Sequence, residues 1–491
     1  MIDVFPFASL PVAVFGLGRS GLSTAKALVK SDAEVWAWDD DEDARTRAAA
    51  EGVPLVDLYK CDWKETTTLV LTPGIPMHHP KPHKIVTLAE AANVEIIGDA
   101  ELLVRTQRES AYIGITGTNG KSTTTALIGH IMQISGREAE VGGNLGIPAL
   151  ELEPIGHEGT YVLEMSSFQI ELTRSITFDV AVLLNISADH LDRYAGMDGY
   201  IAAKKMIFHR QTDPRTAVIG MDDDFCRAIH DELKAAGEQV VIGVSGLARV
   251  PGGVYAVNGI LIDDVEGQQT PVMDLKENAC LPGAHNWQNA AAAYAATKAA
   301  GVPPHAIMAC INSYPGLVHR QEPVALVDGI GYVNDSKATN ADAAARALSC
   351  YDAIYWIAGG RPKEGGLVAA EPHLGNVRHA FLIGEAAMEF SQFLDGKVPF
   401  SVSGDLETAF KAAGDMAAKD KAEGAVVLLS PAAASFDQFE NFEVRGDAFR
   451  DLVEALPGVH IDPSEEPGIF PGTRGPDDMP SGDGPSRETA S

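Results

Sequence analysis

The chain has few cysteines and fewer basic than acidic residues, and each shortage argues against certain classes of protein. Its five cysteines lie at scattered positions with no paired spacing: Cys61, Cys226, Cys280, Cys310 and Cys350. This distribution argues against a disulfide framework and against a cysteine-based zinc site. Lysine and arginine number 38 against 68 acidic residues, which gives a net charge of −30. Because nucleic-acid backbones are bound by basic patches, we expect no nucleic-acid partner.

Long hydrophobic runs are also missing. No stretch of the 491 residues approaches the length of a membrane span, and the N-terminus lacks a basic region followed by an apolar one. We therefore expect a cytoplasmic protein with no membrane partner. Hydrophobic residues still make up 45% of the chain, enough for globular cores, and its length predicts two to four domains.

The most informative stretch is residues 113–125, where an apolar strand leads into a glycine-rich turn and then a helix. We expect the strand over Ala111–Ile115 and the helix over Thr123–Ile134. Backbone N–H groups at a helix N-terminus bind phosphate oxygens, a lysine adds positive charge, and a hydroxyl can ligate Mg²⁺. The pattern predicts a phosphate loop, although Ile115 stands where the common form has glycine. The alternative is a surface turn rich in glycine and threonine.

A second glycine-rich turn, Gly16–Gly21, lies in a βαβ unit near the N-terminus. The strands are expected at Val12–Phe15 and Glu34–Trp38, and the second ends at Asp39 and Asp40. A G-x-G-x-x-G turn with an acid at this distance is typical of dinucleotide binding, but such a unit can hold any nucleotide diphosphate. A dehydrogenase that uses NAD(P) is therefore one alternative.

Two further strand ends and one helix carry side chains suited to a metal ion. Glu164 ends an apolar strand, and a carboxylate in that place beside a phosphate loop is where Mg²⁺ is usually held. His190 follows the strand Val182–Ile186, and Lys204 lies on a helix fourteen residues later. Taken alone, Glu164 is more typical of an ordinary strand-end acid, His190 of a hydrogen-bonding histidine and Lys204 of a solvated lysine; the phosphate loop favours the metal role for Glu164.

The alternation of strands and helices predicts an α/β fold with three domains. They cover residues 1–104, which are Rossmann-like, residues 105–316, which carry the phosphate loop, and residues 317–462, which are again Rossmann-like. A hairpin is expected within Pro251–Pro271. Residues 463–491 are rich in proline, glycine, serine and acid, and we expect a disordered tail.

Five further motifs occur along the chain in the order in which one protein family carries them. They are Thr72-Pro73-Gly74-Ile75, Gly283-x-His285-Asn286-x-x-Asn289 before an expected helix at Ala290–Ala300, Gly316-x-x-His319-Arg320, Asn334-Asp335-Ser336-Lys337-Ala338-Thr339-Asn340, and Ser430 through Gly446. With the phosphate loop, these motifs resemble the Mur ligases and their folylpolyglutamate synthase relatives. Those enzymes use ATP to join an amino acid to a carboxylate. The resemblance covers about residues 10–460, with Ala433 and Phe436 where many members have Cys and Leu.

The resemblance implies an enzyme that adds D-glutamate to UDP-N-acetylmuramoyl-L-alanine for peptidoglycan, through an acyl phosphate. It implies ATP, two Mg²⁺ ions and a CO₂-derived carbamate on Lys204, in a chain that we expect to be a monomer. A folylpolyglutamate synthase would lack the UDP-type first domain, and a regulatory binding protein would keep the fold without turnover. Both remain alternatives.

The residue roles follow from the same resemblance. The catalytic residues are Lys121, Glu164, His190 and Lys204, and the metal ligands are Ser122, Glu164, His190 and Lys204. The ATP-binding residues are Gly117, Thr118, Asn119, Gly120, Lys121, Ser122, Thr123, Asn286, Asn289, Arg320, Asp335 and Lys337. The residues for the UDP substrate are Gly16, Leu17, Gly18, Arg19, Ser20, Asp39, Asp40, Gly74, Asn144, Ser166 and Gln169. Those for D-glutamate are Thr339, Lys363, Ser435, Phe436 and Phe442.

Overall fold

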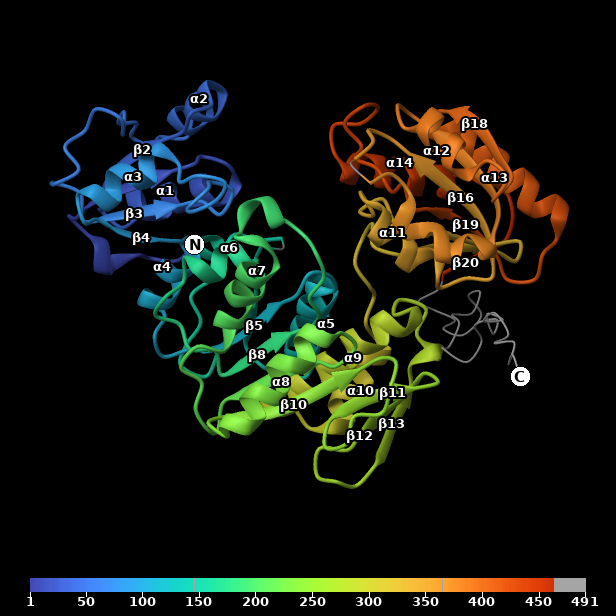
Figure 1. The fold of residues 1–491 in the computed structure, drawn as a ribbon, viewed down its shortest axis with the longest axis horizontal. Coiled ribbons are helices and arrows are strands. Elements are labelled where there is room, and N and C mark those ends of the chain that lie inside the picture. Colours follow the sequence, from blue (N-terminus) through green and yellow to red (C-terminus); the bar gives the residue numbers. More distant parts are fainter. Residues whose placement is uncertain (145, 364, 463–491) are drawn as a thin grey trace, which may run out of the picture. The chain divides into compact units, whose positions relative to one another are not determined.

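Three α/β domains, each built on its own sheet, make up the protein (Figure 1). The computed structural model describes residues 1–144, 146–363 and 365–462, so the predicted tail at 463–491 lies outside the described residues. Within these ranges, none of the helices combines the length and the apolar character that a membrane span requires.

The chain divides into two compact units, whose limits do not follow the predicted domain boundaries. One unit comprises residues 1–255, 263–270 and 288–311, and the other comprises residues 256–262, 271–287 and 312–462 of the described chain. The first unit holds the first sheet and most of the second, and the second unit holds the third sheet. The domain limits given by the sequence therefore stay predictions.

The first sheet is wholly parallel, with the order β2-β1-β3-β4. Its strands are β1 (Pro11–Phe15), β2 (Glu34–Trp38), β3 (Thr68–Leu71) and β4 (Glu95–Ile97), and its helices are α1 (Arg19–Lys30), α2 (Glu42–Ala50), α3 (Lys84–Ala91) and α4 (Asp99–Thr106). Since β2 and β3 flank β1 on opposite sides, the strand order reverses at β1. A crevice at such a point is where open α/β sheets bind ligands.

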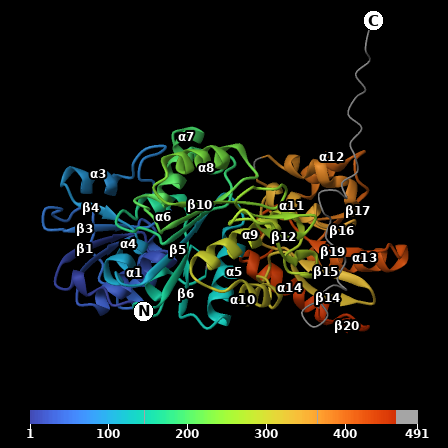
Figure 2. The ribbon, with the colours of Figure 1, turned by 90° about the horizontal axis from the view of Figure 1, so that it is seen from below.

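The second sheet has nine strands in the order β13-β12-β11-β10-β9-β8-β5-β7-β6, and it is parallel from β11 to β6. Its strands are β5 (Ala111–Thr116), β6 (Ala139–Gly143), β7 (Thr160–Glu164), β8 (Val180–Leu183), β9 (Thr216–Gly220), β10 (Val240–Ser245), β11 (Val254–Val257), β12 (Ile260–Asp263) and β13 (Thr270–Asp274). The helices here are α5 (Lys121–Ile134), α6 (Ser167–Glu171), α7 (Gly196–Lys205), α8 (Asp224–Ala236), α9 (Gly283–Ala299) and α10 (Pro304–Asn312). In Figure 2, α7 and α8 lie on one side of this sheet and α5 and α10 on the other.

One helix boundary predicted from the sequence is wrong. Helix α9 begins at Gly283 rather than at Ala290, so Asn286 and Asn289 lie inside it and not ahead of it. The side-chain amide of Asn286 donates to the carbonyl of Pro282 at 2.8 Å, one turn back. An asparagine that bonds back along its own helix does not have to cap one.

The first two domains share one hydrophobic core. A single cluster runs from Val12 and Val14 in β1, through α1 and α4, to Leu163 in β7 and Ile229 in α8. The chain start belongs to this contact, because the N–H of Ile2 donates to the carbonyl of Leu150 at 2.8 Å. Burial of this size makes the two domains one stable unit.

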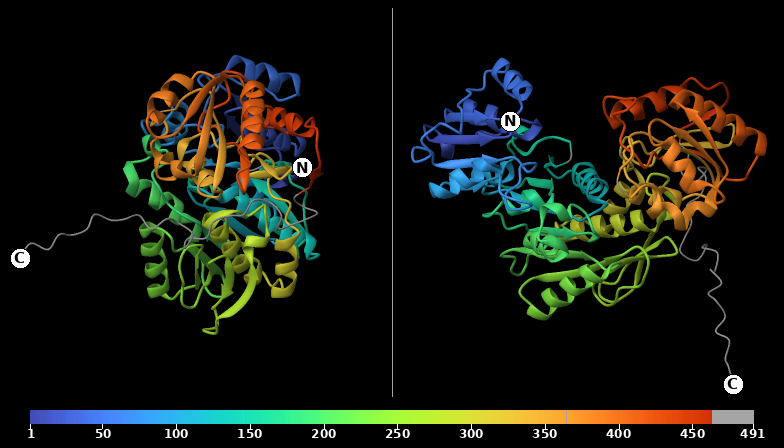
Figure 3. Two further views of the ribbon diagram at one scale, coloured as in Figure 1. Left: turned by 90° about the vertical axis from the view of Figure 1, so that its right-hand side faces the viewer. Right: turned by 45° about the horizontal axis from the view of Figure 1, so that its top comes forward.

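The third sheet has the order β18-β17-β16-β19-β15-β14-β20 and is parallel except at β14, which is antiparallel to both neighbours. Its strands are β14 (Glu322–Val327), β15 (Ile330–Asn334), β16 (Ala353–Gly359), β17 (Val377–Ile383), β18 (Phe400–Gly404), β19 (Ala425–Leu429) and β20 (His460–Ile461). Its helices are α11 (Ala341–Leu348), α12 (Ala387–Leu394), α13 (Leu406–Asp420) and α14 (Phe442–Glu454). Separate apolar clusters cover the two faces, one with α11 and α12 and one with α13 and α14. Figure 3 shows this domain, coloured from orange to red, with helices on both sides of its sheet.

Candidate active site

The predicted phosphate loop lies between β5 and α5 and depends on two glycines in left-handed conformations. Gly117 has φ of 155° and Gly120 has φ of 84°. A Cβ atom on Gly120 would lie 2.4 Å from Oδ1 of Asn289, so the α9 side chain reaches the loop only because residue 120 is glycine. Residues 117–120 therefore form a tight turn between β5 and α5. In such a turn, the backbone N–H groups at the helix N-terminus are available to phosphate oxygens.

Two lysines meet at this loop. Nζ of Lys121 donates to the carbonyls of Gly117 at 2.9 Å and Thr118 at 3.0 Å. Nζ of Lys204, from α7, donates to the same Gly117 carbonyl at 2.8 Å. The Lys204 side chain is only 1% exposed, and burial, followed by the Lys121 ammonium, lowers its pKa well below 10.5. An amine with a lowered pKa can be uncharged near neutral pH and can act as a nucleophile.

Glu164, at the carboxyl end of β7, carries the second chemical group of the site. Its Oε1 accepts from Nδ2 of Asn144 at 2.6 Å, and its residue exposure is 2%. Its Oε2 is buried and makes no hydrogen bond with any described residue. A buried carboxylate oxygen without a partner is costly, so it needs a ligand such as a hard cation. With the buried hydroxyl-bearing Ser122 on α5, this set of oxygens suits Mg²⁺.

His190 follows β8 on the loop that leads to α7. Its ring lies 3.6 Å from the Asp189 carboxylate and, tilted by 58°, 5.5 Å from the Phe168 ring, and its side chain is 56% exposed. No group of three or more His, Cys, Asp or Glu residues suited to a metal occurs among the described residues. The hydrogen bonds thus join Asn144 to Glu164 and bring Lys121 and Lys204 to one carbonyl, while the charges of Asp189, next to His190, and of Glu164 both act on Lys204.

Arg193, on the loop that carries His190, received no role from the sequence. Its guanidinium donates to the carbonyl of Gly74 at 3.1 Å and lies 4.6 Å from the Phe168 ring. It therefore ties the predicted UDP turn of the first domain to the predicted metal loop of the second. Its position directly after Asp189-His190-Leu191-Asp192, beside the predicted metal ligand His190, was the available signal.

The residues predicted for the UDP substrate form two groups. In the first domain a Cβ on Gly16 would lie 2.0 Å from Oγ1 of Thr72, so the two glycine-containing turns are in contact. Asp39 accepts from the N–H of Leu17 at 2.5 Å, and Asp40 accepts from the hydroxyl of Tyr59 at 2.7 Å.

The second group lies at α6 in the central domain. Ser166 and Gln169 form a capping box, in which each side chain bonds to the other residue's backbone N–H. Both side chains are thus fixed at the N-terminus of α6, close in sequence to Glu164.

Asp335, which follows β15, is the most perturbed acid of the third domain. Its Oδ1 accepts from the N–H of Gln321 at 3.1 Å, and its Oδ2 accepts from the hydroxyl of Ser430 at 2.8 Å. Burial raises the pKa of this carboxyl to about 7. Perturbed acids of this kind are enriched at functional sites.

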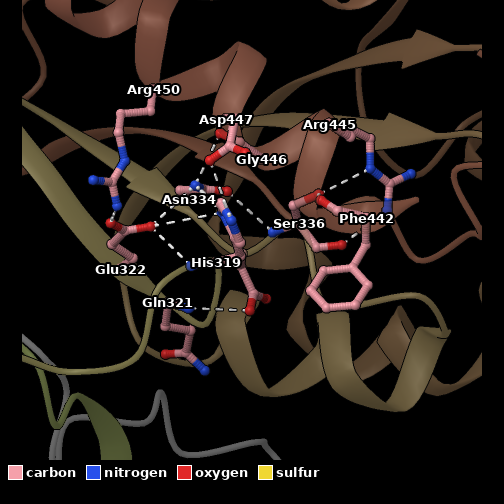
Figure 4. Close-up of polar contacts among 11 residues, drawn as sticks. His319, Gln321, Glu322, Asn334, Ser336, Phe442, Arg445, Gly446, Asp447 and Arg450 are labelled. Carbon is pink, nitrogen blue, oxygen red and sulfur yellow. Dashed lines mark hydrogen bonds and ion pairs between the residues drawn. The ribbon is translucent and has the colours of Figure 1, made fainter. Parts of the chain in front are cut away.

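Arg445, on α14, joins the motifs of the third domain (Figure 4). It is 1% exposed, and its guanidinium donates to the hydroxyl and carbonyl of Ser336 and to the carbonyl of Ala433. Burial lowers its pKa to about 10, because a charged group loses water there.

The residues predicted for D-glutamate lie around these contacts in the third domain. Nζ of Lys337 lies 3.7 Å from the Phe442 ring, and Ser435 is 2% exposed. Phe436 is 63% exposed. Lys363 is also exposed, and its loop pairs with the Ser435 segment through Arg361 and Ala434. Phe442 thus lies beside Lys337, a residue predicted for ATP.

Comparison with known proteins gives one family. The Mur ligase middle domain matches residues 115–297. A UDP-N-acetylmuramoylalanine–D-glutamate ligase of Rhodospirillum rubrum is 50% identical over 473 residues, which cover 95% of this chain and 99% of the relative. A relative of the same name from Caulobacter sp. strain K31 is 50% identical and covers 93% and 98%.

Two solved structures share the fold at low identity. A pseudomurein peptide ligase type C from Methanothermus fervidus has a TM-score of 0.54 at 17% identity, and the match covers 91% of this chain and 100% of that one. A UDP-N-acetylmuramate–alanine ligase from Thermotoga maritima also has a TM-score of 0.54 at 17% identity, with 91% and 99% covered.

Proposed function

The chain belongs to the Mur ligase family, and from that premise we propose that it joins D-glutamate to UDP-N-acetylmuramoyl-L-alanine. It is an ATP-dependent ligase of peptidoglycan precursor synthesis. The choice of D-glutamate and of the UDP substrate rests on the relatives at 50% identity.

The reaction needs ATP because a free carboxylate is a poor electrophile. The carboxylate of the L-alanyl group attacks the γ-phosphorus of ATP, ADP leaves, and an acyl phosphate forms. The amine of D-glutamate then attacks the acyl carbon and loses a proton, and inorganic phosphate leaves with its bonding pair. The products are the amide, ADP and phosphate.

The phosphate loop and its lysine would hold the transferred group. Backbone N–H groups of the loop and Nζ of Lys121 would contact the β- and γ-phosphates. Bound Mg²⁺ would neutralise charge that develops on the phosphoryl oxygens. Ser122 and Glu164 would hold one ion, and His190 and a modified Lys204 would hold the second.

The modification of Lys204 would be a carbamate. An ammonium repels a metal ion, whereas the amine adds to the carbon of CO₂, loses one proton and becomes an anionic oxygen ligand. The lowered pKa of Lys204 supports this step, because only the uncharged amine has a free electron pair.

The residues predicted from the sequence would contact the adenine and ribose of ATP and the UDP substrate. Asn286 and Asn289 would face adenine, whose ring edge needs paired donors and acceptors, and Asp335 would face the ribose. Asp39, Asp40 and Gly74 would lie at the UDP group. Asn144, Ser166 and Gln169 would contact the rest of that substrate.

Arg320 and Lys337 would contact the ATP phosphates, as charged donors do in phosphoryl transfer. For D-glutamate, Thr339, Lys363 and Ser435 would supply donors to its carboxylates. Phe436 and Phe442 would pack beside the chain of the amino acid.

The observation that carries the proposal is Lys204, a buried lysine with a lowered pKa that shares a carbonyl with the lysine of a phosphate loop. The test is ADP release by the pure protein with Mg²⁺, ATP, UDP-N-acetylmuramoyl-L-alanine and D-glutamate, and with each substrate omitted in turn. We expect release only from the complete mixture. Equal release without D-glutamate, or without the UDP substrate, would contradict the proposal.

A further inference from the structure

We infer that Glu322 is a positioning residue, which holds the His319–Gln321 turn so that Arg320 presents its guanidinium to ATP. The inference rests on the proposed contact of Arg320 with the ATP phosphates. Glu322 itself begins β14 and belongs to none of the motifs that predicted the site. Figure 4 shows it on the opposite side of His319 from Phe442 and Arg445.

The turn around Arg320 has an unfavourable backbone. His319 has φ of 63° and Gln321 has φ of 41°, so the residues on both sides of Arg320 are left-handed although neither is glycine. L side chains rarely adopt this conformation unless the surroundings enforce it. Something other than local preference therefore holds the turn.

Glu322 supplies one of the restraints directly. Its Oε2 accepts from the N–H of His319 at 2.8 Å and from Nδ2 of Asn334 at 3.1 Å. Its Oε1 forms an ion pair with the guanidinium of Arg450 on α14. The side chain is 14% exposed, so these bonds are partly shielded from water.

The other restraints connect the same turn to the predicted ATP residues. The N–H of Gln321 donates to Asp335 at 3.1 Å, and the carbonyl of His319 accepts from the N–H of Lys337 at 3.0 Å. The carboxylates of Glu322 and Asp335 thus fix the N–H groups on either side of Arg320. The turn is thus hydrogen-bonded to both Asp335 and Lys337 of the third domain.

The groups around the Glu322 carboxylate are closely packed. Nδ2 of Asn334 lies 2.9 Å from Nδ1 of His319 and donates to the carbonyl of Gly446 at 3.1 Å. A Cβ on Gly446 would lie 2.2 Å from Nδ1 of His319, so α14 and the turn are in direct contact. Removing the carboxylate would free the His319 N–H and leave the Arg450 guanidinium without this ion-pair partner.

The inference predicts a selective loss of ATP recognition. Glu322→Ala is expected to raise the KM for ATP roughly tenfold or more, since small displacements of a phosphate-binding cation have large effects. The KM for D-glutamate should change less than about twofold, because that contact does not depend on Arg320. Binding of a non-hydrolysable ATP analogue, followed by calorimetry, should weaken by the same factor as the KM.

Three companion variants separate positioning from folding. Glu322→Gln keeps an acceptor oxygen for the His319 N–H and should recover most of the ATP affinity. Arg450→Ala keeps the Glu322 carboxylate and should give an intermediate effect. Glu371→Ala removes a partly exposed carboxylate paired with Lys397 at 2.8 Å in the same domain, and should leave all KM values unchanged. If Glu322→Ala does not fold, the Gln and Arg450 variants carry the test.

Arg320→Ala distinguishes this inference from the proposed function. If Arg320→Ala raises the KM for ATP and Glu322→Ala changes it less than twofold, the positioning role is wrong and the proposed ligase stands. If Arg320→Ala also leaves ATP binding unchanged, the phosphate contact is wrong and the positioning role falls with it. Equal rises in the KM for ATP and D-glutamate would show general damage and would also overturn the inference.

Discussion

At the scale of single residues, the chemistry depends on the difference between Lys204 and its neighbour Lys205. Lys204 is 1% exposed and has a lowered pKa, whereas Lys205 forms a surface ion pair with Glu232. Lys204→Ala should abolish ADP release, and short carboxylic acids in the buffer should partly restore it by replacing the lost anionic oxygen. Lys205→Ala should reduce the rate less than about twofold, as exposed ion pairs contribute little. Equal, severe and unrescued loss in both variants would argue against a carbamate.

A second residue-scale prediction concerns Asp335 and pH. Its pKa of about 7 in the folded state lies above its ordinary value of 3.8, so between these values only the folded state keeps the proton. The stability due to Asp335 is therefore full below pH 3.8 and is lost as the pH rises through 7. Asp335→Asn stays neutral, so the Tm of the wild type should fall relative to that of the variant between about pH 5 and pH 8.

The measurement is the difference in Tm between the two proteins across that pH range, at constant ionic strength. Parallel curves would show that Asp335 is ionised throughout. At pH 8, where Asp335 is ionised, the variant should also bind ATP more weakly, because an amide is a poorer acceptor for a ribose hydroxyl than a carboxylate is.

At the scale of elements, α4 joins the first domain to the second through one buried acid. Oε2 of Glu101 accepts from the N–H groups of Arg174 at 2.8 Å and Ser175 at 2.9 Å, and its side chain is fully buried. Glu101→Ala should lower the free energy of unfolding by about 3 kcal/mol, since buried N–H groups would lose their acceptor. Glu101 and Glu95 both form ion pairs with Arg105, but Glu95 is 40% exposed, so Glu95→Ala should cost less than about 1 kcal/mol. Urea unfolding that gives similar losses for both would contradict this role.

The phosphate loop at the start of α5 gives a second prediction at this scale. Lys121→Ala removes a cation that donates to the loop carbonyls of Gly117 and Thr118, and leaves the glycine turns intact. The variant should keep a Tm within a few degrees of the wild type and release no ADP. Ordinary ADP formation by a folded Lys121→Ala protein would contradict the assignment of the loop.

The positions of many strands and helices could be predicted from the sequence, because apolar runs and glycine turns within each segment determine them. The strand at Glu34–Trp38 lies where its apolar run predicts it, and the helix after Gly120 begins at Lys121, within two residues of the expected start. Helix α9 was misplaced because the Asn286 side chain can either cap a helix or bond inside one. Local sequence does not distinguish these two uses.

The long-range contacts of the site could not be predicted in the same way. Arg193 reaches Gly74 across 119 residues of sequence, and Arg450 reaches Glu322 across 128. Neither pair belongs to a shared motif, so only the fold brings its members together. The motif residues Lys121, Glu164 and Lys204 were predicted because a family resemblance records such contacts indirectly, and their catalytic roles stay predictions.

At the scale of the whole molecule, three α/β domains with a net charge of −30 belong to a family whose substrates carry phosphates and carboxylates. The electrostatic field of the negatively charged protein therefore opposes the binding of anionic substrates, and local cations have to overcome it at short range. Lys121, Arg320, Lys337 and Lys363 are such cations by the proposed assignment. Specificity should accordingly depend on a few paired groups rather than on overall charge.

The central claim is that this ligase selects D-glutamate, and the most direct measurement is kcat/KM for D-glutamate and for D-alanine. D-alanine lacks the side-chain carboxylate and would leave the donors proposed for it unpaired. A site built to pair that group should prefer D-glutamate by roughly 10⁴-fold or more. Values of kcat/KM within about tenfold of each other would contradict the account.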